Sequence, residues 1–121
     1  MSGKLLIVIL SGPEDVNRTR WALRMAMNMY THPYGEKVLE DVKVLLFCSG
    51  VSIVDPSTPS YEELSRRLRD LKQSGVEVAS CISIAEPLGL AVESKAQGIK
   101  LVHASVYVAE KVSEGYAVMT F

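Results

Sequence analysis

The stretch that decides the fold of this chain is residues 4–10, which read KLLIVIL. A run with no polar residue after its lysine is typical of a strand buried on both faces, as in the middle of a parallel sheet. Further extended runs follow at residues 42–47, 76–80, 99–102 and 116–121. Strict alternation of strands and helices predicts parallel strands joined by right-handed crossovers. We therefore expect an α/β fold, a three-layer α/β/α sandwich around a five-stranded parallel sheet.

Two long helical patterns have clear starting signals. The first follows Pro13, which suits the first position of a helix, and its apolar residues predict one buried stripe: Trp21, Ala22, Met25, Ala26 and Met29. The second opens with a capping box formed by Ser60 and Glu63 and ends at Gly75. Its core face is predicted to consist of Tyr61, Leu64, Leu68 and Leu71.

The remaining connections are less regular. Ser83 and Glu86 form a second capping box, although Pro87 can also mark the first helical position and move the start. A further helix is expected over residues 104–114. Residues 51–59 contain prolines and small polar residues, so we expect a surface loop there.

Length and composition limit the class of protein. The chain has 121 residues, which fits a single domain over residues 1–121. Apolar residues make up 48%, charged residues 22%, and the net charge is −1, which argues against nucleic acid as a partner. No apolar run is long enough for a bilayer, so we expect no membrane contact. Two cysteines without C-x-x-C spacing fit a reducing compartment, and we expect a cytoplasmic protein.

Residues able to do chemistry gather where the predicted strands end. Ligand sites in open α/β sheets lie beyond the carboxyl ends of the strands. Those ends carry Ser11-Gly12, Cys48-Ser49-Gly50, Cys81 and His103. Cys81 stands out because a helix start is predicted directly after it, and backbone N–H groups there stabilise a thiolate over a thiol. The preceding Ser80 indicates that the strand leaves the core at this point, which makes Cys81 a candidate nucleophile.

The same residues also have structural interpretations. A cysteine is often simply a small buried hydrophobe, which fits Cys48 as the continuation of residues 42–47 and stays open for Cys81. A histidine at a strand end, such as His103, is more often a hydrogen-bonding group than a base. Ser11-Gly12-Pro13 has one glycine and a proline without an N–H, so a phosphate loop is not expected. A metal site needs at least three converging ligands, and we expect neither a metal nor a cofactor.

The chain resembles the DsrE/DsrF-like proteins, a family of small sulfur-relay proteins. The resemblance covers nearly the whole length and rests on the order and spacing of an N-terminal buried strand, a long first helix, and the segments LKQSG (71–75), VEVASC (76–81) and EGYAVMTF (114–121). It implies the strand order 4-3-2-1-5 and assembly as oligomers, often trimers or hexamers. It also implies a role for Cys81, because sulfur-transferring members carry persulfide sulfur on the cysteine after the third strand.

The implied strand order makes strands four, three and two neighbours. His103, Cys81 and Cys48 are then expected side by side, because adjacent strands are about 4.8 Å apart. The family pattern does not supply Cys48, so a two-cysteine site with a disulfide or a shared sulfur is our inference from this chain alone. The candidate substrate-binding residues at the same edge are Ser11, Gly12, Ser49 and Gly50.

These expectations combine into a functional hypothesis. The protein takes sulfur from a donor protein or thiol, holds it as a persulfide on Cys81, and passes it to an acceptor thiol, with His103 adding positive charge. The activity expected of such a protein is that of a sulfurtransferase acting through a cysteine persulfide, and the resemblance implies a homo-oligomer. Two alternatives stay open: a non-catalytic oligomeric subunit, and a small-molecule binding domain that uses residues 48–59 as a lid.

Overall fold

A five-stranded parallel sheet forms the middle layer of the computed structural model, which describes residues 3–121. The strands are β1 (Gly3–Ile9), β2 (Leu39–Leu46), β3 (Glu77–Cys81), β4 (Lys100–Val102) and β5 (Ala117–Thr120). Their order is β4-β3-β2-β1-β5, and every neighbouring pair is parallel. The predicted fold class and strand order are both confirmed.

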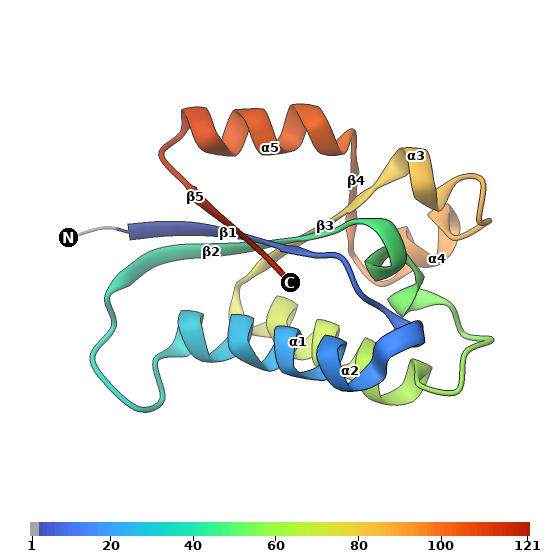
Figure 1. Cartoon of the computed structure of the whole chain (residues 1–121), viewed down its shortest axis with the longest axis horizontal. Coiled ribbons are helices and arrows are strands. Elements are labelled where there is room, and N and C mark those ends of the chain that lie inside the picture. Colours follow the sequence, from blue (N-terminus) through green and yellow to red (C-terminus); the bar gives the residue numbers. More distant parts are fainter. Residues whose placement is uncertain (1–2) are drawn as a thin grey trace.

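Helices cover both faces of this sheet (Figure 1). The helices α1 (Val16–Thr31) and α2 (Tyr61–Ser74) lie on one face, and α5 (Ala104–Ser113) lies on the other. Two short helices, α3 (Ile82–Ala85) and α4 (Ala91–Ala96), lie beside β4. Two 3₁₀ segments, η1 (Pro13–Asp15) and η2 (Cys48–Val54), follow β1 and β2. No helix within residues 3–121 is long and apolar enough to cross a membrane.

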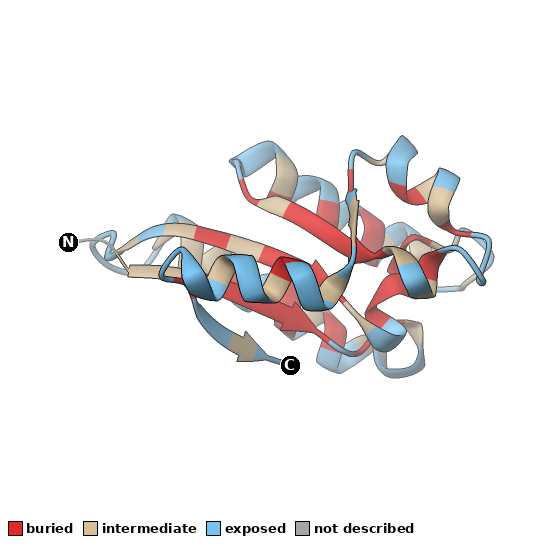
Figure 2. Ribbon diagram, turned by 90° about the horizontal axis from the view of Figure 1, so that it is seen from above, coloured by how far each residue is buried: buried red, intermediate tan, exposed pale blue. Residues whose placement is uncertain are grey.

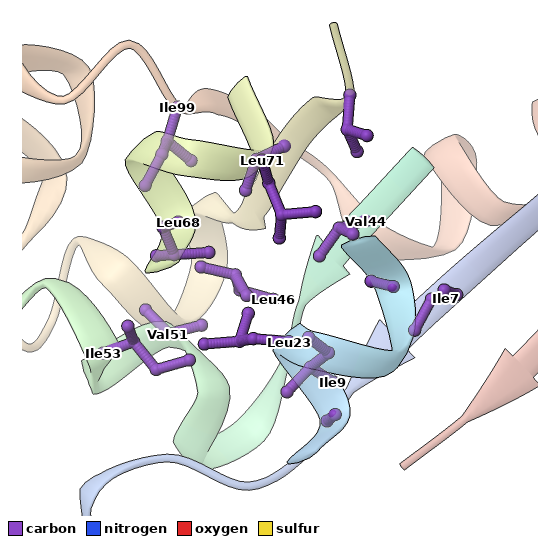
Figure 3. Close-up of a cluster of buried hydrophobic side chains, with 14 of the residues drawn as sticks. Ile7, Ile9, Leu23, Val44, Leu46, Val51, Ile53, Leu68, Leu71 and Ile99 are labelled. Atoms are coloured by element: carbon purple, nitrogen blue, oxygen red, sulfur yellow. The ribbon is translucent and has the colours of Figure 1, made fainter. Parts of the chain in front are cut away.

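The hydrophobic core is divided unequally between the two faces of the sheet. Successive side chains of a strand point to opposite faces. The larger cluster lies between the sheet and the helices α1 and α2, where Ile7, Ile9, Val44 and Leu46 meet Leu23 (Figure 3). The smaller cluster lies under α5 and contains Leu6, Val8, Leu45, Ala79, Tyr107 and Tyr116. The central strands are buried accordingly, whereas β5 is largely exposed (Figure 2).

The buried face of α1 differs from the predicted stripe. Ala22 and Ala26 are buried as expected, but Trp21 is 54% exposed and Met25 is 45% exposed. The third buried apolar position of α1 is Leu23, on the other side of the alanines. Each helical residue turns by about 100°, so the buried stripe is rotated by roughly one residue from the prediction. Small alanines let the helix approach the sheet closely, and Trp21 and Met25 lie on its outer side.

The composition of residues 51–59 predicted a surface loop, and this prediction is wrong for residues 51–54. The segment η2 extends to Val54 and buries Gly50, Val51, Ile53 and Val54. Val51 and Ile53 belong to the same cluster as Leu46 and Leu68 (Figure 3). Burial of these apolar side chains orders the segment, and the exposed turn is confined to the residues before α2.

Neither capping box is formed. Ser60 is the N-cap of α2 but makes no side-chain capping bond, although the helix has the predicted span and ends at Gly75 with a positive φ of 108°. Its residues Leu64, Leu68 and Leu71 are buried as predicted, and Tyr61 is only partly buried. The helix after β3 begins at Ile82, one residue before Ser83, so Cys81 itself is the N-cap.

A network of charged and tyrosine side chains fixes α5 on the sheet near the amino ends of the strands. Tyr107 donates a hydrogen bond to Glu77 Oε2 at 2.5 Å, and Tyr116 donates one to Asp41. Lys43 lies between the two carboxylates, 3.2 Å from Asp41 Oδ2 and 3.8 Å from Glu77 Oε2. Burial and these hydrogen bonds raise the pKa of both tyrosines, so both hydroxyls remain donors at neutral pH.

An ion pair between α1 and α2 makes stability depend on pH. The Arg20 guanidinium donates to Glu63, with Nη2 2.8 Å from Oε1, and this hydrogen bond lowers the pKa of Glu63 to about 2 from 4.5. A depressed folded pKa stabilises the fold above the unfolded value, and this contribution is lost as the pH falls from 4.5 towards 2.

We expect Glu63→Gln to lower the melting temperature by a few degrees at neutral pH, because the ion pair is partly exposed. Glu62→Gln, which changes an exposed carboxylate one residue away, is the control. Thermal unfolding across pH should show the two variants converging near pH 2. A Glu63→Gln deficit that persists unchanged at that pH would show that the loss comes from packing.

Candidate functional site

A hollow of about 760 Å³ opens on the α5 face of the sheet, at the carboxyl ends of the strands. We call it the α5 hollow. Thirteen residues line it: Val8, Leu10, Leu45, Phe47, Cys81, Ser83, His103, Ala104, Ser105, Val108, Ala109, Val118 and Thr120. The residues that α5 contributes are Ala104, Ser105, Val108 and Ala109, and three of these four are small. Short side chains leave the space between helix and sheet unfilled, which explains why a hollow forms here.

Cys81 lies where β3 ends and its side chain lines the α5 hollow. Its partner on β4 is Val102, and the preceding Ser80 pairs with Leu46 on β2. The thiol also packs against the core cluster, and the residue is only 4% exposed. The structure corrects one expectation here. Ser80 is 1% exposed, so the strand does not leave the core before the cysteine.

The backbone after Cys81 turns into α3, as the sequence predicts. This helix has only four residues, so few peptide dipoles are aligned behind the sulfur. The stabilisation of a Cys81 thiolate by this helix stays a prediction. The position of the cysteine at a strand end, facing a cavity, is shown by the structure.

His103 shares the α5 hollow with Cys81. It is exposed, follows Val102 directly, and is the N-cap of α5. Since Val102 pairs with Cys81, the histidine lies one residue beyond the position opposite the thiol. The sequence correctly brings these two residues to one edge. A role for His103 in proton transfer stays a prediction.

Cys48 is not part of the α5 hollow. It is an exposed free thiol at the start of η2, and its backbone has a left-handed φ of 52°. Phe47, one residue earlier, directly follows the pair of Leu46 and Ser80 and lines the hollow instead. Cys48 and Cys81 are both free thiols in the structure. The chain turns away from the sheet after Phe47, which is why the two cysteines do not line one cavity.

Ser11, Gly12, Ser49 and Gly50 form a tight backbone crossing outside the α5 hollow. A Cβ on Gly12 would come well under 3.0 Å from the Ser49 carbonyl oxygen, a separation that real Cβ atoms do not show. A Cβ on Gly50 would meet the Ile9 carbonyl oxygen in the same way. Ser11 Oγ accepts a hydrogen bond of 2.8 Å from the Thr19 hydroxyl. These contacts give the four residues a packing role, and their predicted role in substrate binding has no support from the hollow.

The α5 hollow is apolar and contains one thiol. None of its lining residues is Lys, Arg, Asp or Glu, and its polar side chains are Ser83, His103, Ser105 and Thr120. Within residues 3–121, no three His, Cys, Asp or Glu side chains converge as a metal site requires. The hollow therefore combines the thiol of Cys81 with the imidazole of His103 in a largely apolar cavity.

Several lining residues were not predicted as site residues. Val118 and Thr120 alternate along the last strand, and this period-2 pattern is the signal that they share one face. Phe47 and Val108 carry no such signal, because both fit an ordinary core position. The hollow itself depends on how α5 docks, which no local pattern encodes.

Comparison with known proteins adds a family and two structural neighbours. The sequence model of the DsrE/DsrF-like family matches residues 3–121. A conserved protein of unknown function from Bacteroides thetaiotaomicron is similar with a TM-score of 0.76 at 14% identity, over 98% of this chain and 94% of that one. A protein of unknown function from Methanobacterium thermoautotrophicum has a TM-score of 0.72 at 15% identity, over 99% and 100%. These two likenesses show the fold alone. No curated protein matches the chain.

Proposed function

This chain belongs to the DsrE/DsrF-like family, and from that premise we propose that it is a sulfur carrier that holds persulfide sulfur on Cys81. The observation that carries the proposal is the position of this thiol, which ends β3 and lines the α5 hollow. The family match supports sulfur chemistry for a cysteine after the third strand. The hollow supports access to that cysteine for a molecule bound at the carboxyl edge of the sheet.

Loading is a displacement at sulfur. The Cys81 thiolate attacks the outer sulfur of a donor persulfide R–S–SH, a bond forms between these sulfurs, and the S–S bond of the donor breaks. The products are Cys81–S–SH and the donor thiolate R–S⁻, so no external oxidant or reductant is required. In our proposal His103 supplies positive charge near the thiolate and exchanges the proton of the thiol with solvent, since it is exposed and lines the same cavity.

Transfer of the sulfur to an acceptor is the same kind of displacement, with Cys81 now as the leaving group. An acceptor thiolate attacks the outer sulfur of Cys81–S–SH, and the Cys81 thiolate leaves. A thiol that is 4% exposed is reached only through the hollow, which restricts the molecules that can remove the sulfur. Access is one of the factors that set the rate of such exchange. The burial of Cys81 thus protects its cargo.

The assignment of partners and location is part of the same proposal. We place the protein in the cytoplasm, with donor and acceptor proteins or thiols as its partners, and as a homo-oligomer on the family's pattern. The alternative function is a non-catalytic oligomeric subunit. The low exposure of Cys81 favours that alternative, because a structural cysteine has no need of access.

We expect the native protein to gain one sulfur atom from a persulfide donor and to return to its original mass when an acceptor thiol is added. Intact mass spectrometry before and after each step measures both events. Alkylation of native and denatured protein is the control for access to the thiol. If no sulfur is gained, and Cys81 reacts with alkylating agent only after denaturation, the protein is the non-catalytic subunit.

A further inference from the structure

We propose that the α5 hollow selects a donor with an uncharged, apolar body, such as an alkyl or aryl hydrodisulfide, over anionic sulfur donors. The inference rests on the proposed function, because it names the class of molecule that delivers sulfur to Cys81. It follows from three features of the hollow: its uncharged lining, its size, and the position of its thiol.

The lining of the hollow is unsuited to anions. No lysine or arginine is among the thirteen lining residues, and His103 is the one side chain there that can become positive. An anion that enters an apolar cavity gives up hydration and requires a paired charge in return. Thiosulfate carries two negative charges. The body of glutathione persulfide carries two carboxylates and one ammonium group, so it is anionic overall. A benzyl or alkyl group gains instead from contact with Leu45, Phe47 and Val108, which line the walls.

The size of the hollow fits a small molecule. Its volume of about 760 Å³ lies within the range of roughly 300–1,000 Å³ that is usual for ligand pockets. A stable interface with a second protein chain involves roughly 20–30 residues a side, more than the thirteen that line the hollow. The concave shape between α5 and the sheet therefore favours a small ligand over a second copy of this chain.

The hollow also orients such a donor. Cys81 comes from a central strand, while Val118 belongs to the edge strand β5 and is 41% exposed. An apolar body along the wall between these residues places its sulfur end toward the thiol. The Cys81 thiolate then takes the outer sulfur, the donor S–S bond breaks, and the apolar thiolate departs. No charge on the donor body is needed for this step.

The test compares two donors that differ in one charge. Benzyl hydrodisulfide and 4-carboxybenzyl hydrodisulfide have the same reacting sulfurs, and the carboxylate is remote from them. Each loading rate of the native protein is divided by the rate of the same donor with free cysteine, which removes intrinsic reactivity. Because a carboxylate that enters an apolar cavity loses hydration without gaining a paired charge, we expect benzyl hydrodisulfide to load Cys81 about tenfold faster or more. Equal normalised rates would overturn the inference.

A positive charge placed in the hollow should weaken this preference. Val118→Lys adds a cation at a lining position that is 41% exposed, so the chain can fold with it. Val112→Lys, on the exposed side of α5 and outside the hollow, is the matched control. We expect Val118→Lys to raise the 4-carboxybenzyl rate relative to the benzyl rate by several-fold, and Val112→Lys to leave the ratio unchanged. A ratio that both lysines change equally would overturn the inference.

A measurement without sulfur transfer separates this inference from the proposed function. Benzyl methyl sulfide has no sulfur to donate, and its binding to Cys81→Ser is followed by NMR shifts of residues around the hollow. Binding there without loading of the parent protein by any donor would overturn the carrier function and leave the apolar site in place. Loading by anionic donors without binding of the sulfide would overturn the apolar site and leave the carrier function. If the sulfide does not bind because two copies of the protein associate through the hollow, this surface is an interface between copies. That result would also overturn the inference.

Discussion

Replacing Cys81 with serine is expected to abolish sulfur uptake. A serine hydroxyl is nearly the size of a thiol, but it is not ionised at neutral pH and does not form a persulfide. Loss of a nucleophile that reacts covalently lowers rates by about a thousandfold or more. Cys81 is 4% exposed and packs against the core cluster, so the substitution exchanges one small side chain for another of similar size at a buried position. Intact mass after incubation with a persulfide donor gives the result directly.

Cys48→Ser is the matched control for this experiment. It makes the same chemical change at an exposed thiol outside the α5 hollow. We expect this variant to take up sulfur at the parent rate. Uptake that survives in Cys81→Ser but disappears in Cys48→Ser would move the carrier function to the exposed cysteine. Circular dichroism of both variants distinguishes loss of chemistry from loss of folding.

Gly50→Ala is expected to destabilise the fold strongly. Its Cβ would be placed well under 3.0 Å from the carbonyl oxygen of Ile9, at the end of a central strand. Backbone cannot move aside as a flexible side chain can, and overpacking of this kind costs about 3 kcal/mol in unfolding free energy. The Ile9 carbonyl also accepts a hydrogen bond from the N–H of Phe47, the N-cap of η2, and the shift would disturb this bond as well.

Gly35→Ala is the control, because nothing lies within 4 Å of its Cβ and its φ is not positive. Its effect should stay within about 0.5 kcal/mol. Urea unfolding of both variants, followed by circular dichroism, compares the midpoints at unchanged slope. If Gly50→Ala unfolds at the parent midpoint, the crossing of the two backbone segments is looser than the structure shows.

The sheet could be predicted from the sequence because its signals are local. The run at residues 4–10 has no polar residue after Lys4, and it forms β1, whose residues Leu5 to Ile9 are buried. The helix α2 also agrees with its pattern, since Leu64, Leu68 and Leu71 share one face. The strand order was predicted from the family resemblance. The family match confirms the resemblance, and the structure has the predicted strand order.

The errors arose where tertiary packing decided between local alternatives. Trp21 and Ala22 both fit an apolar stripe, and the close approach of α1 to the sheet selected the smaller residue. The prolines and polar residues from Asp55 to Pro59 predicted a loop over residues 51–59, but Val51 and Ile53 in η2 belong to the hydrophobic core. Ser83 was expected to cap a helix that begins one residue before it.

The candidate site was predictable only in part. Cys81 and His103 follow strand ends, and the rule that ligands bind at the carboxyl edge of a parallel sheet brings them together. The separation of Cys48 could not be read from the strand order, because it depends on the turn after Phe47. The hollow depends on small residues of α5 and on the distant tyrosine network that holds this helix over the sheet. Such features require the three-dimensional structure.

Locating the transferred sulfur in the native protein tests the central claim most directly. The parent protein is exposed to a persulfide donor, trapped with an alkylating agent, and digested, and the modified peptides are identified by mass spectrometry. The account predicts one added sulfur on the peptide that contains Cys81, with Cys48 alkylated as an ordinary thiol. Added sulfur on Cys48 alone, with Cys81 unmodified, would contradict it.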